Sequence, residues 1–267
     1  MSNLKLKVVQ LPLTGKGEVI VKRYKKAHAA SPIKDASTLK AMRAALADSG
    51  KYSRRNLAIF DLGVCSGRRC GDILCLQLHE VWSDLHGLKN KIEYWDQKTR
   101  KWKRFFLSDI AYNNLKQYVE EAGYVVDGKR VVPVNTYLFP SRKKSEKVQP
   151  GTFTVTKTKI VDGIVQEVTA EYKHRSLPSG CLEVSTYRRI LTDAARKHAI
   201  TGIEHLGTHT MRKTFGYHGF RQNGAEFVQL ALGHSSMNVT QHYLTLDDEY
   251  LENEYTRLKI PGMEEEV

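Results

Sequence analysis

The hydrophobic pattern changes its period twice along the chain, and this constrains the fold more than any other feature of the sequence. Between residues 35 and 76, apolar side chains recur at helical spacing, as Met42 and Leu46 do. Between residues 91 and 107, apolar and polar positions alternate, which is typical of strands. Helical spacing then returns over most of the remaining chain. The sequence therefore predicts a mixed fold, mainly α, with a small antiparallel β-sheet.

Capping residues and glycines give the expected limits of the helices. Asp35 or Ser37 can cap a first helix that ends at Gly50. A second helix over 52–62 leads into a glycine-marked turn at 63–67. Further helical segments are expected at 72–76, 109–122, from a cap at Ser185 onward, 209–223, 226–232 and 247–258.

Two hairpins and two terminal segments complete the expected layout. The strands 92–95 and 102–107 flank a polar turn and form the small sheet. Residues 152–173 look like a second hairpin, because β-rich runs bracket Asp162-Gly163, a two-residue turn signal. Residues 1–31 read as a short basic arm or hairpin, and residues 261–267 read as an acidic tail.

The bulk composition favours a soluble protein with a polyanionic partner. The 42 Lys and Arg residues against 29 Asp and Glu residues give a formal charge of +13, which suits binding to phosphates. The sequence has neither a signal-peptide pattern nor an apolar run long enough for a membrane span, so we expect no membrane partner. The four cysteines lack a paired CxxC pattern, which fits a reducing cytoplasm.

Three short motifs in the last third of the chain carry the most chemical information. They are Thr208-His209-Thr210-Met211-Arg212, Leu232-Gly233-His234 and Gln241-His242-Tyr243. On a helix, His209 and Arg212 share one face because they stand three residues apart. A guanidinium can hold two oxygens of one phosphate, while an imidazole can donate another hydrogen bond or move a proton. The pair therefore predicts a phosphate site.

These motifs resemble those of the catalytic domain of tyrosine recombinases, which are also called phage integrases. That family has a His-x-x-Arg pair, a later Leu-Gly-His and then a Tyr, and the chain keeps this order through Tyr243. The resemblance covers roughly residues 32–258 and implies the tyrosine recombinase catalytic-domain fold. It also implies that Tyr243 is the nucleophile that becomes joined to a DNA phosphate.

An earlier arginine motif extends the resemblance. The run from Gly67 to Leu74 looks like the family's Gly-x-Arg-x-x-Glu-Leu-Leu, which implies a catalytic Arg69 with Asp72 as a supporting acid. By itself, Arg69 would be read as a surface arginine or a salt-bridge partner of Asp72. Its interpretation as catalytic depends on the later motifs, which follow in the family's order.

A lysine-rich turn supplies the last element. Gln97-Lys98-Thr99-Arg100-Lys101 resembles the family's Lys-Thr-Gly-Lys turn, which implies Lys98 as the catalytic lysine, with Lys101 and Lys103 as open alternatives. In the implied mechanism, Arg69 and Arg212 hold the negative oxygens of the phosphate, and Lys98 protonates the departing 5′ oxygen. His209 moves a proton or binds the phosphate, and His234 donates a hydrogen bond to it.

The resemblance implies a site-specific DNA recombinase that integrates, excises or inverts DNA through a 3′-phosphotyrosine and a four-way junction. Its expected partners are double-stranded DNA with paired sites, a homotetramer on that DNA and accessory DNA-bending proteins, in the cytoplasm at the nucleoid. No metal or other cofactor is expected, since His205 and His209 have metal-like spacing but no further ligand beside them. The alternatives are a type IB topoisomerase and a non-catalytic DNA-binding protein of the same fold.

Two departures from the family accompany this interpretation. Family members usually carry a separate helical domain before the catalytic one, whereas 31 residues precede Pro32 here. We therefore expect a catalytic domain over 32–260 that either acts as a single domain or relies on a partner to complete the clamp around DNA. The hairpin at 152–173 is longer than the loop usually found there, and its role stays open.

Overall fold

The computed structural model describes residues 30–96, 98–141, 147–148, 151–161, 164–174, 177–178 and 180–244. Three expected features lie outside the described residues: the basic arm up to residue 29, the helix 247–258 and the acidic tail.

The described residues contain helices from the start of the described chain to its end. They are α1 (Ala36–Ala47), the 3-10 helix η1 (Gly50–Tyr52), α2 (Ser53–Ser66), α3 (Cys70–Leu74), α4 (Leu78–Val81), α5 (Asp109–Glu121), α6 (Val184–Lys197), α7 (Thr210–Leu232) and α8 (Met237–Leu244). The strands form five antiparallel pairs: β1 (Trp82–Ser83) with β2 (Gly87–Leu88), β3 (Lys91–Asp96) with β4 (Lys101–Phe106), β5 (Val125–Val126) with β6 (Lys129–Arg130), β7 (Lys147–Val148) with β10 (Leu177–Pro178), and β8 (Gly151–Val161) with β9 (Ile164–His174).

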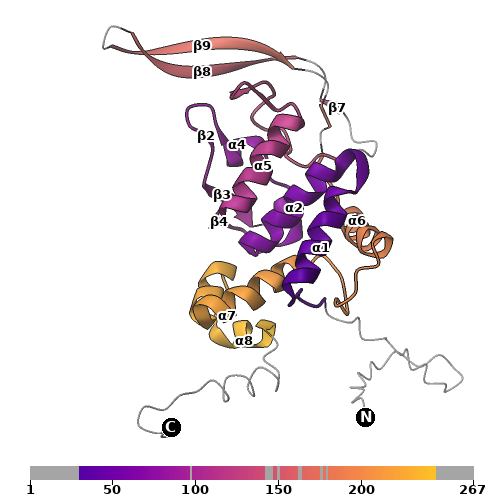
Figure 1. Ribbon diagram of the computed structural model, residues 1–267. Helices are drawn as coiled ribbons and strands as arrows, with labels where there is room; N and C mark the ends of the chain where they lie inside the picture. The colour runs from indigo at the N-terminus through magenta and orange to yellow at the C-terminus, as the bar shows by residue number, and fades with distance from the viewer. Residues whose placement is uncertain are drawn as a thin grey trace, which may run out of the picture.

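The predicted fold class, mainly α with small antiparallel sheets, is confirmed (Figure 1). The β3–β4 pair has the alternation that the sequence indicates: Ile92 and Tyr94 are buried, and Phe105 faces the same core from β4. Tyr94 and Phe105 contact each other edge to face, with ring centroids 5.7 Å apart. This packing fixes the small sheet against the helical body and so fixes the turn between its strands.

Helix α2 is the central element of the core. It packs against α1, α5 and α7, and its residues from Arg55 to Gly63 are all buried. The predicted turn at 63–67 is wrong for its first part, because α2 continues to Ser66. Gly63 stays helical and leaves room for a neighbour: a Cβ at this position would lie 2.6 Å from Sδ of Met211 in α7. This glycine serves close helix packing, and the chain turns only at Gly67.

Gly67 ends α2 in the left-handed conformation, with φ of 65°, and directs the chain toward Arg69. A Cβ there would lie 2.5 Å from Cδ1 of Phe215 and 2.7 Å from Cδ2 of Leu232. We expect Gly67→Ala to destabilise the protein by about 2–4 kcal/mol, because backbone strain and overpacking add together. Urea melts would measure this change in the free energy of unfolding.

Gly128→Ala is the matched control for that measurement, because Gly128 has φ of 70° but no atom within 4 Å of its added Cβ. It isolates the strain of a left-handed alanine, about 1 kcal/mol. Equal losses in the two variants would contradict the packing role of Gly67.

Helix boundaries depart from the expectations at three places. Helix α1 is capped by Asp35, whose carboxylate accepts from the N–H of Thr38, but it ends at Ala47, since Gly50 begins a separate 3-10 helix. Helix α6 begins at Val184 after the cap residue Glu183, so the predicted cap at Ser185 is wrong. Helix α8 was not expected at all.

The sequence predicted two helices, 209–223 and 226–232. The structure has one helix, α7, with a kink at the expected break. Gly224 adopts a non-helical conformation there, with φ of 80° and ψ of 177°. The first half of α7 is tied to the start of the described chain, because the N–H of Ile33 donates to Oγ1 of Thr214 at 2.9 Å. A ring nitrogen of His218 also lies 3.0 Å from the carbonyl oxygen of Ile33. These contacts fix the orientation of the helix that begins next to His209.

The β8–β9 hairpin projects from the helical body on the side opposite α7 and α8 (Figure 1). Its strands pair from Gly151 with His174 to Val161 with Ile164, so two residues connect them at the position of the Asp162-Gly163 signal. The hairpin is thus a long two-stranded extension of the helical body.

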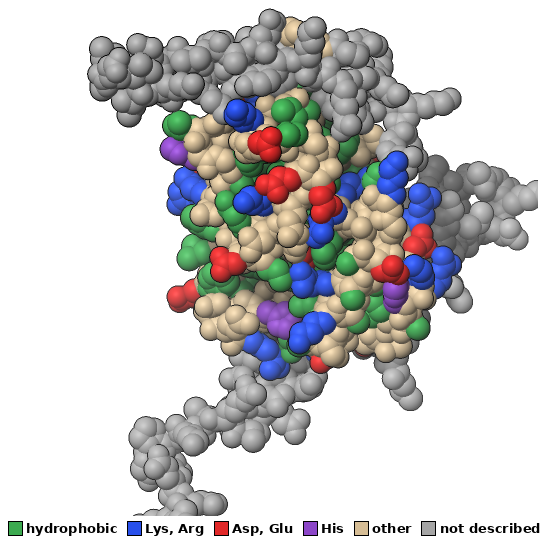
Figure 2. Space-filling view, turned by 45° about the horizontal axis from the view of Figure 1, so that its top comes forward, with side chains coloured by type: hydrophobic (Ala, Val, Ile, Leu, Met, Phe, Trp, Pro, Cys, Tyr) green, Lys and Arg blue, Asp and Glu red, His purple; other side chains and the backbone are tan. Residues whose placement is uncertain are grey.

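The surface of the helical body carries charges of both signs. Figure 2 shows one face, on which Lys and Arg side chains are interspersed with Asp and Glu and with hydrophobic side chains. Positive charge on this face therefore does not gather into one block. None of the helices in the described part of the chain is long and apolar enough to cross a membrane.

Candidate active site

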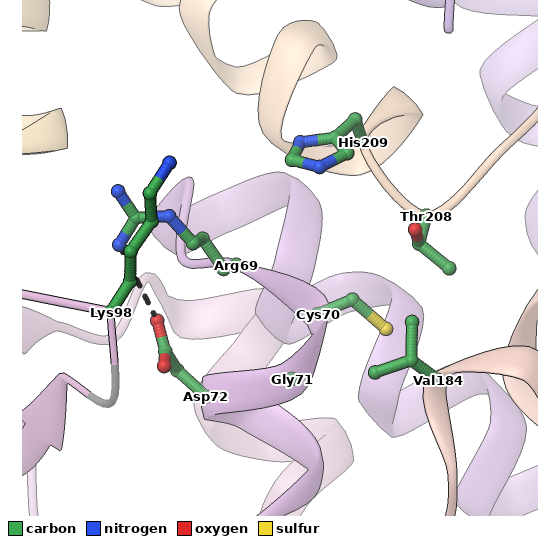
Figure 3. Close-up of a pocket in the computed structure, with 8 residues that line it drawn as sticks. All are labelled: Arg69, Cys70, Gly71, Asp72, Lys98, Val184, Thr208 and His209. Atoms are coloured by element: carbon green, nitrogen blue, oxygen red, sulfur yellow. Dashed lines mark ion pairs between the residues drawn. The ribbon is translucent and has the colours of Figure 1, made fainter. Parts of the chain in front are cut away.

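Four of the predicted site residues, Arg69, Asp72, Lys98 and His209, line one pocket of about 240 Å³. Figure 3 shows the ends of the Arg69 and Lys98 side chains on one side of it and the ring of His209 on the other. The remaining lining residues are Cys70, Gly71, Val184 and Thr208. The pocket therefore brings two cations and an imidazole together from segments far apart in the sequence.

Each of these side chains stands at the end of an element, where the backbone changes direction. Arg69 is the N-cap residue of α3, two residues after the left-handed Gly67. Lys98 lies in the turn between β3 and β4, and His209 is the N-cap residue of α7. Such positions place polar side chains at the surface of a rigid scaffold, which suits binding of a phosphate from outside.

Arg69 lies between two carboxylates. Its Nη1 atom is 2.8 Å from Oδ2 of Asp96 and 3.9 Å from Oδ2 of Asp72. Asp72 was expected near Arg69 from the sequence, whereas Asp96 was missed. The sequence did contain a signal for Asp96: it is an acidic residue at a buried position of an alternating strand, next to the lysine-rich turn.

The three candidates for the catalytic lysine occupy different positions. Lys98 is exposed and lines the pocket with Arg69. Lys103 is mostly buried, with Nζ 2.8 Å from Oδ2 of Asp96, and its side chain lies close to Gly233. Lys101 is exposed at the start of β4. Among these three lysines, Lys98 is the one that the pocket includes.

Arg212 is buried and holds two loops together. Its Nη1 donates to the carbonyl of Gly67 at 2.7 Å, and its Nη2 donates to the carbonyl of Leu232 at 3.1 Å. Nη2 also lies 3.2 Å from Nε2 of His234. The guanidinium thus links the turn that leads to Arg69 with the loop that carries His234.

The contacts of His234 define which ring nitrogen carries the proton. Arginine can only donate hydrogen bonds, so Nε2 of His234 must accept from Arg212. Nδ1 then carries the proton and donates to Oγ1 of Thr240 at 3.0 Å. Before a phosphate is bound, His234 is therefore oriented by two partners, one from α7 and one from α8.

Burial and nearby cations keep both histidines neutral at pH 7. Burial is the main cause that lowers the pKa of His209, and the charges of Arg212 and Arg69 lower it further. Burial likewise lowers the pKa of His234, to about 4, with added effects from Arg212 and Arg69. A neutral imidazole can accept a proton, which a histidinium cannot do.

The lowered pKa of His234 predicts a pH effect on stability. As the pH falls from about 6.5, the pKa of an unfolded histidine, to about 4, the unfolded chain gains a proton that the folded chain excludes, so stability is lost. We expect the melting temperature of the wild type to fall more steeply over this window than that of His234→Asn, which cannot titrate. Thermal melts at closely spaced pH values measure both slopes; the same slope for both proteins would disprove a depressed pKa.

The predicted nucleophile, Tyr243, belongs to α8, which packs against the end of α7. The backbone of this helix is described, while the side chain of Tyr243 lies outside the described residues. Thr240, three residues earlier on the same helix, contacts His234. This contact links the helix that carries Tyr243 with the Arg212 and His234 pair.

Comparisons with known proteins show which family the chain is similar to. The family model described as the phage integrase family matches residues 34–250. The probable integrase/recombinase YoeC of Bacillus subtilis (strain 168) is 28% identical over 225 residues, which cover 83% of this chain and 93% of that protein.

Solved structures share the fold at low sequence identity. The XerA recombinase aligns over 87% of this chain and 66% of its own, with a TM-score of 0.57 and 21% identity. The XerH site-specific recombinase in its post-cleavage complex aligns over 86% of this chain and 54% of its own, with a TM-score of 0.57 and 17% identity. This chain thus spans between 54% and 66% of these two structures. On the match of the family model to most of its length, the chain belongs to the phage integrase family, the tyrosine recombinases.

Proposed function

We propose that the protein is a site-specific DNA recombinase that cleaves and rejoins DNA through a 3′-phosphotyrosine intermediate. The observation that carries this proposal is the convergence of Arg69, Lys98 and His209 on one pocket. Arg212 donates to the carbonyl of Gly67, two residues before Arg69, and contacts His234. In-line displacement at a phosphodiester builds negative charge on the non-bridging oxygens. Cations that are already held in place stabilise this charge without reorganisation.

The proposed roles conserve atoms and protons. Oη of Tyr243 attacks phosphorus, the bond from phosphorus to the 5′ oxygen breaks, and the 3′ phosphate becomes joined to the tyrosine. The phenolic proton passes to His209, whose lowered pKa keeps it neutral at pH 7. Lys98 gives a proton to the departing 5′ oxygen. The reverse step, with the 5′ hydroxyl of another strand, rejoins DNA without ATP.

Double-stranded DNA is the proposed partner. The formal charge of +13 favours a polyanion. The solved structures of similar fold include XerH bound to a palindromic difH substrate and the Tn1549 transposon integrase in complex with transposon right end DNA. By analogy with these proteins, we propose paired recombination sites on DNA and a role in the movement of a genetic element.

We further propose a tetramer on DNA that passes through a four-way junction, with accessory proteins that bend the DNA. Residues 32–260 would form the catalytic domain, while residues 1–31 and 261–267 flank it. The protein would act on the nucleoid in the cytoplasm.

The experiment that tests the proposal uses nicked suicide substrates with candidate inverted repeats. In such a substrate, the short strand beyond the cleavage site diffuses away, so the covalent intermediate accumulates. We expect a protein–DNA species that resists SDS and that forms on particular sites. Relaxation of any supercoiled plasmid would instead favour a type IB topoisomerase, and binding without an adduct on any substrate would favour a non-catalytic DNA-binding protein.

A separate prediction concerns metal ions. The proposed chemistry uses only side chains of the protein, so adduct formation should be unchanged within about twofold by EDTA, far less than the loss of a catalytic group would cause. Across the residues that the structure describes, His, Cys, Asp and Glu side chains nowhere gather in threes at metal-binding geometry. The measurement is the rate of adduct formation with and without EDTA. Loss of activity that Zn²⁺ or Mg²⁺ restores would contradict the proposed mechanism.

A further inference from the structure

The carboxylate of Asp96 joins three parts of the candidate site. Asp96 is the last residue of β3, and its side chain is 1% exposed. Its Oδ2 atom lies 2.8 Å from Nη1 of Arg69 and 2.8 Å from Nζ of Lys103. Its Oδ1 atom accepts a hydrogen bond of 2.8 Å from the N–H of Thr99. One residue therefore contacts the start of α3, the strand β4 and the β3–β4 turn.

The backbone of Asp96 reinforces the same turn. Its carbonyl oxygen accepts a hydrogen bond of 2.8 Å from the N–H of Arg100. Lys98 lies in the turn between Asp96, which ends β3, and Lys101, which begins β4. The two hydrogen bonds from Thr99 and Arg100 to Asp96 close this turn. The turn that presents Lys98 to the pocket is thus anchored by one buried acid.

Electrostatics keep this acid ionised. Burial by itself raises the pKa of Asp96, but hydrogen bonds from Lys103 and Thr99 and the charge of Arg69 outweigh it and hold the pKa well below its ordinary value. A buried carboxylate without such partners would be strongly destabilising. The charge on Asp96 is therefore permanent at neutral pH and balanced by two cations.

We propose that Asp96 is a positioning residue for phosphoryl transfer, which fixes the orientation of Arg69 and the conformation of the turn that carries Lys98. The proposal rests on the recombinase function proposed above. A guanidinium is planar and carries its donors in fixed directions, so a contact at Nη1 sets where the other donors point. Asp72 lies 3.9 Å from the same atom and constrains Arg69 less.

Asp96→Asn tests the part of the proposal that concerns Arg69. The amide oxygen can still accept from Thr99, but the charge that holds Arg69 and Lys103 is lost. We expect single-turnover cleavage to slow by about 10- to 100-fold, as is typical for groups that orient an active residue, while the dissociation constant for DNA changes by less than about threefold. Asp96→Glu keeps the charge with a longer side chain and should fall between Asp96→Asn and the wild type.

Asp61→Asn is the matched control. Asp61 is similarly buried, at 3% exposure, and its Oδ1 lies 2.8 Å from Nε of Arg43, but it contacts α1 and α5 rather than the pocket. It should lose stability in urea melts yet keep its cleavage rate. A purely structural role for Asp96 would make both variants lose stability and cleavage in the same proportion, which would overturn the proposal.

Asp96→Ala tests the part that concerns the turn, since it also removes the acceptor for Thr99. In DNA-free protein, brief trypsin treatment followed by mass spectrometry should show faster cutting after Lys98, Arg100 and Lys101 than in the wild type or in Asp61→Asn. On a substrate with sulfur in place of the bridging 5′ oxygen, a leaving group that needs no proton, Asp96→Ala should regain part of its rate. Asp96→Asn, which keeps the acceptor for Thr99, should not regain rate on this substrate.

These readouts distinguish a failure of the proposed recombinase function from a failure of the positioning role of Asp96. If the wild type forms no covalent adduct on any DNA, the recombinase function fails, while the trypsin result still decides whether Asp96 holds the turn. If the wild type forms an adduct and Asp96→Asn cleaves at the same rate, the recombinase function stands and the positioning role of Asp96 is overturned. Unchanged tryptic cutting in Asp96→Ala likewise overturns the role of Asp96 in the turn.

Discussion

Tyr243→Phe is expected to form no covalent adduct with DNA while it binds DNA with a dissociation constant within about twofold of the wild type. The substitution removes only the phenolic oxygen, which is the atom that attacks phosphorus in covalent catalysis. Suicide-substrate assays resolved on SDS gels measure the adduct, and electrophoretic mobility shifts measure binding. Because no other atom changes, the adduct should drop below detection rather than decline gradually.

Two tyrosines further along the chain are controls for this prediction. Tyr250→Phe and Tyr255→Phe make the same chemical change at nearby positions. Both variants should form the adduct at close to the rate of the wild type. Adduct formation that persists in Tyr243→Phe and disappears in either control would move the nucleophile to that tyrosine.

Arg212→Ala is expected to slow cleavage by at least about a hundredfold, the scale seen when one preorganised donor to a reacting oxygen is removed. It should also destabilise the fold, because the carbonyl oxygens of Gly67 and Leu232 lose their charged donor, at about 1–3 kcal/mol for each buried group. Single-turnover cleavage, measured well below the melting temperature of the variant, separates the two effects. Arg212→Lys should also be slow, because an ammonium cannot reach both carbonyls at once.

Arg221→Ala controls for the loss of a positive charge from the same helix. Arg221 is exposed on α7 and lies over the ring of Tyr217, 5.1 Å from its centroid. It should lower DNA affinity slightly and leave the cleavage step unchanged. If Arg212→Ala cleaved as fast as Arg221→Ala once DNA was saturating, Arg212 would have no role in the reaction.

Features that depend on neighbours in the sequence were predictable. The cap at Asp35 and the β3–β4 pair follow from local hydrogen bonding and from the alternation of apolar residues. The end of α2 was misplaced because Gly63 looks like a helix breaker. Its real surroundings, the side chain of Met211 about 150 positions away, are invisible in a local pattern.

The candidate site also has features that the sequence could predict and contacts that it could not. Motif order named Arg69, Lys98 and His209 as candidate site residues, and these three residues line one pocket. Motif order gave no indication that Arg212 donates to the backbone of Gly67, or that Asp96 contacts Arg69 and Lys103. These contacts join segments between 7 and 145 residues apart. They require the tertiary packing and cannot be deduced from spacing.

The residue that becomes joined to DNA can be identified chemically, and Tyr243 is the expected one. The adduct trapped on a suicide substrate is digested with nuclease and trypsin, and the remaining peptide is sequenced by mass spectrometry. We predict a single modified peptide, with the nucleotide joined through a 3′ phosphate to the oxygen of Tyr243. A nucleotide on any other residue, or a linkage through a 5′ phosphate, would contradict the account.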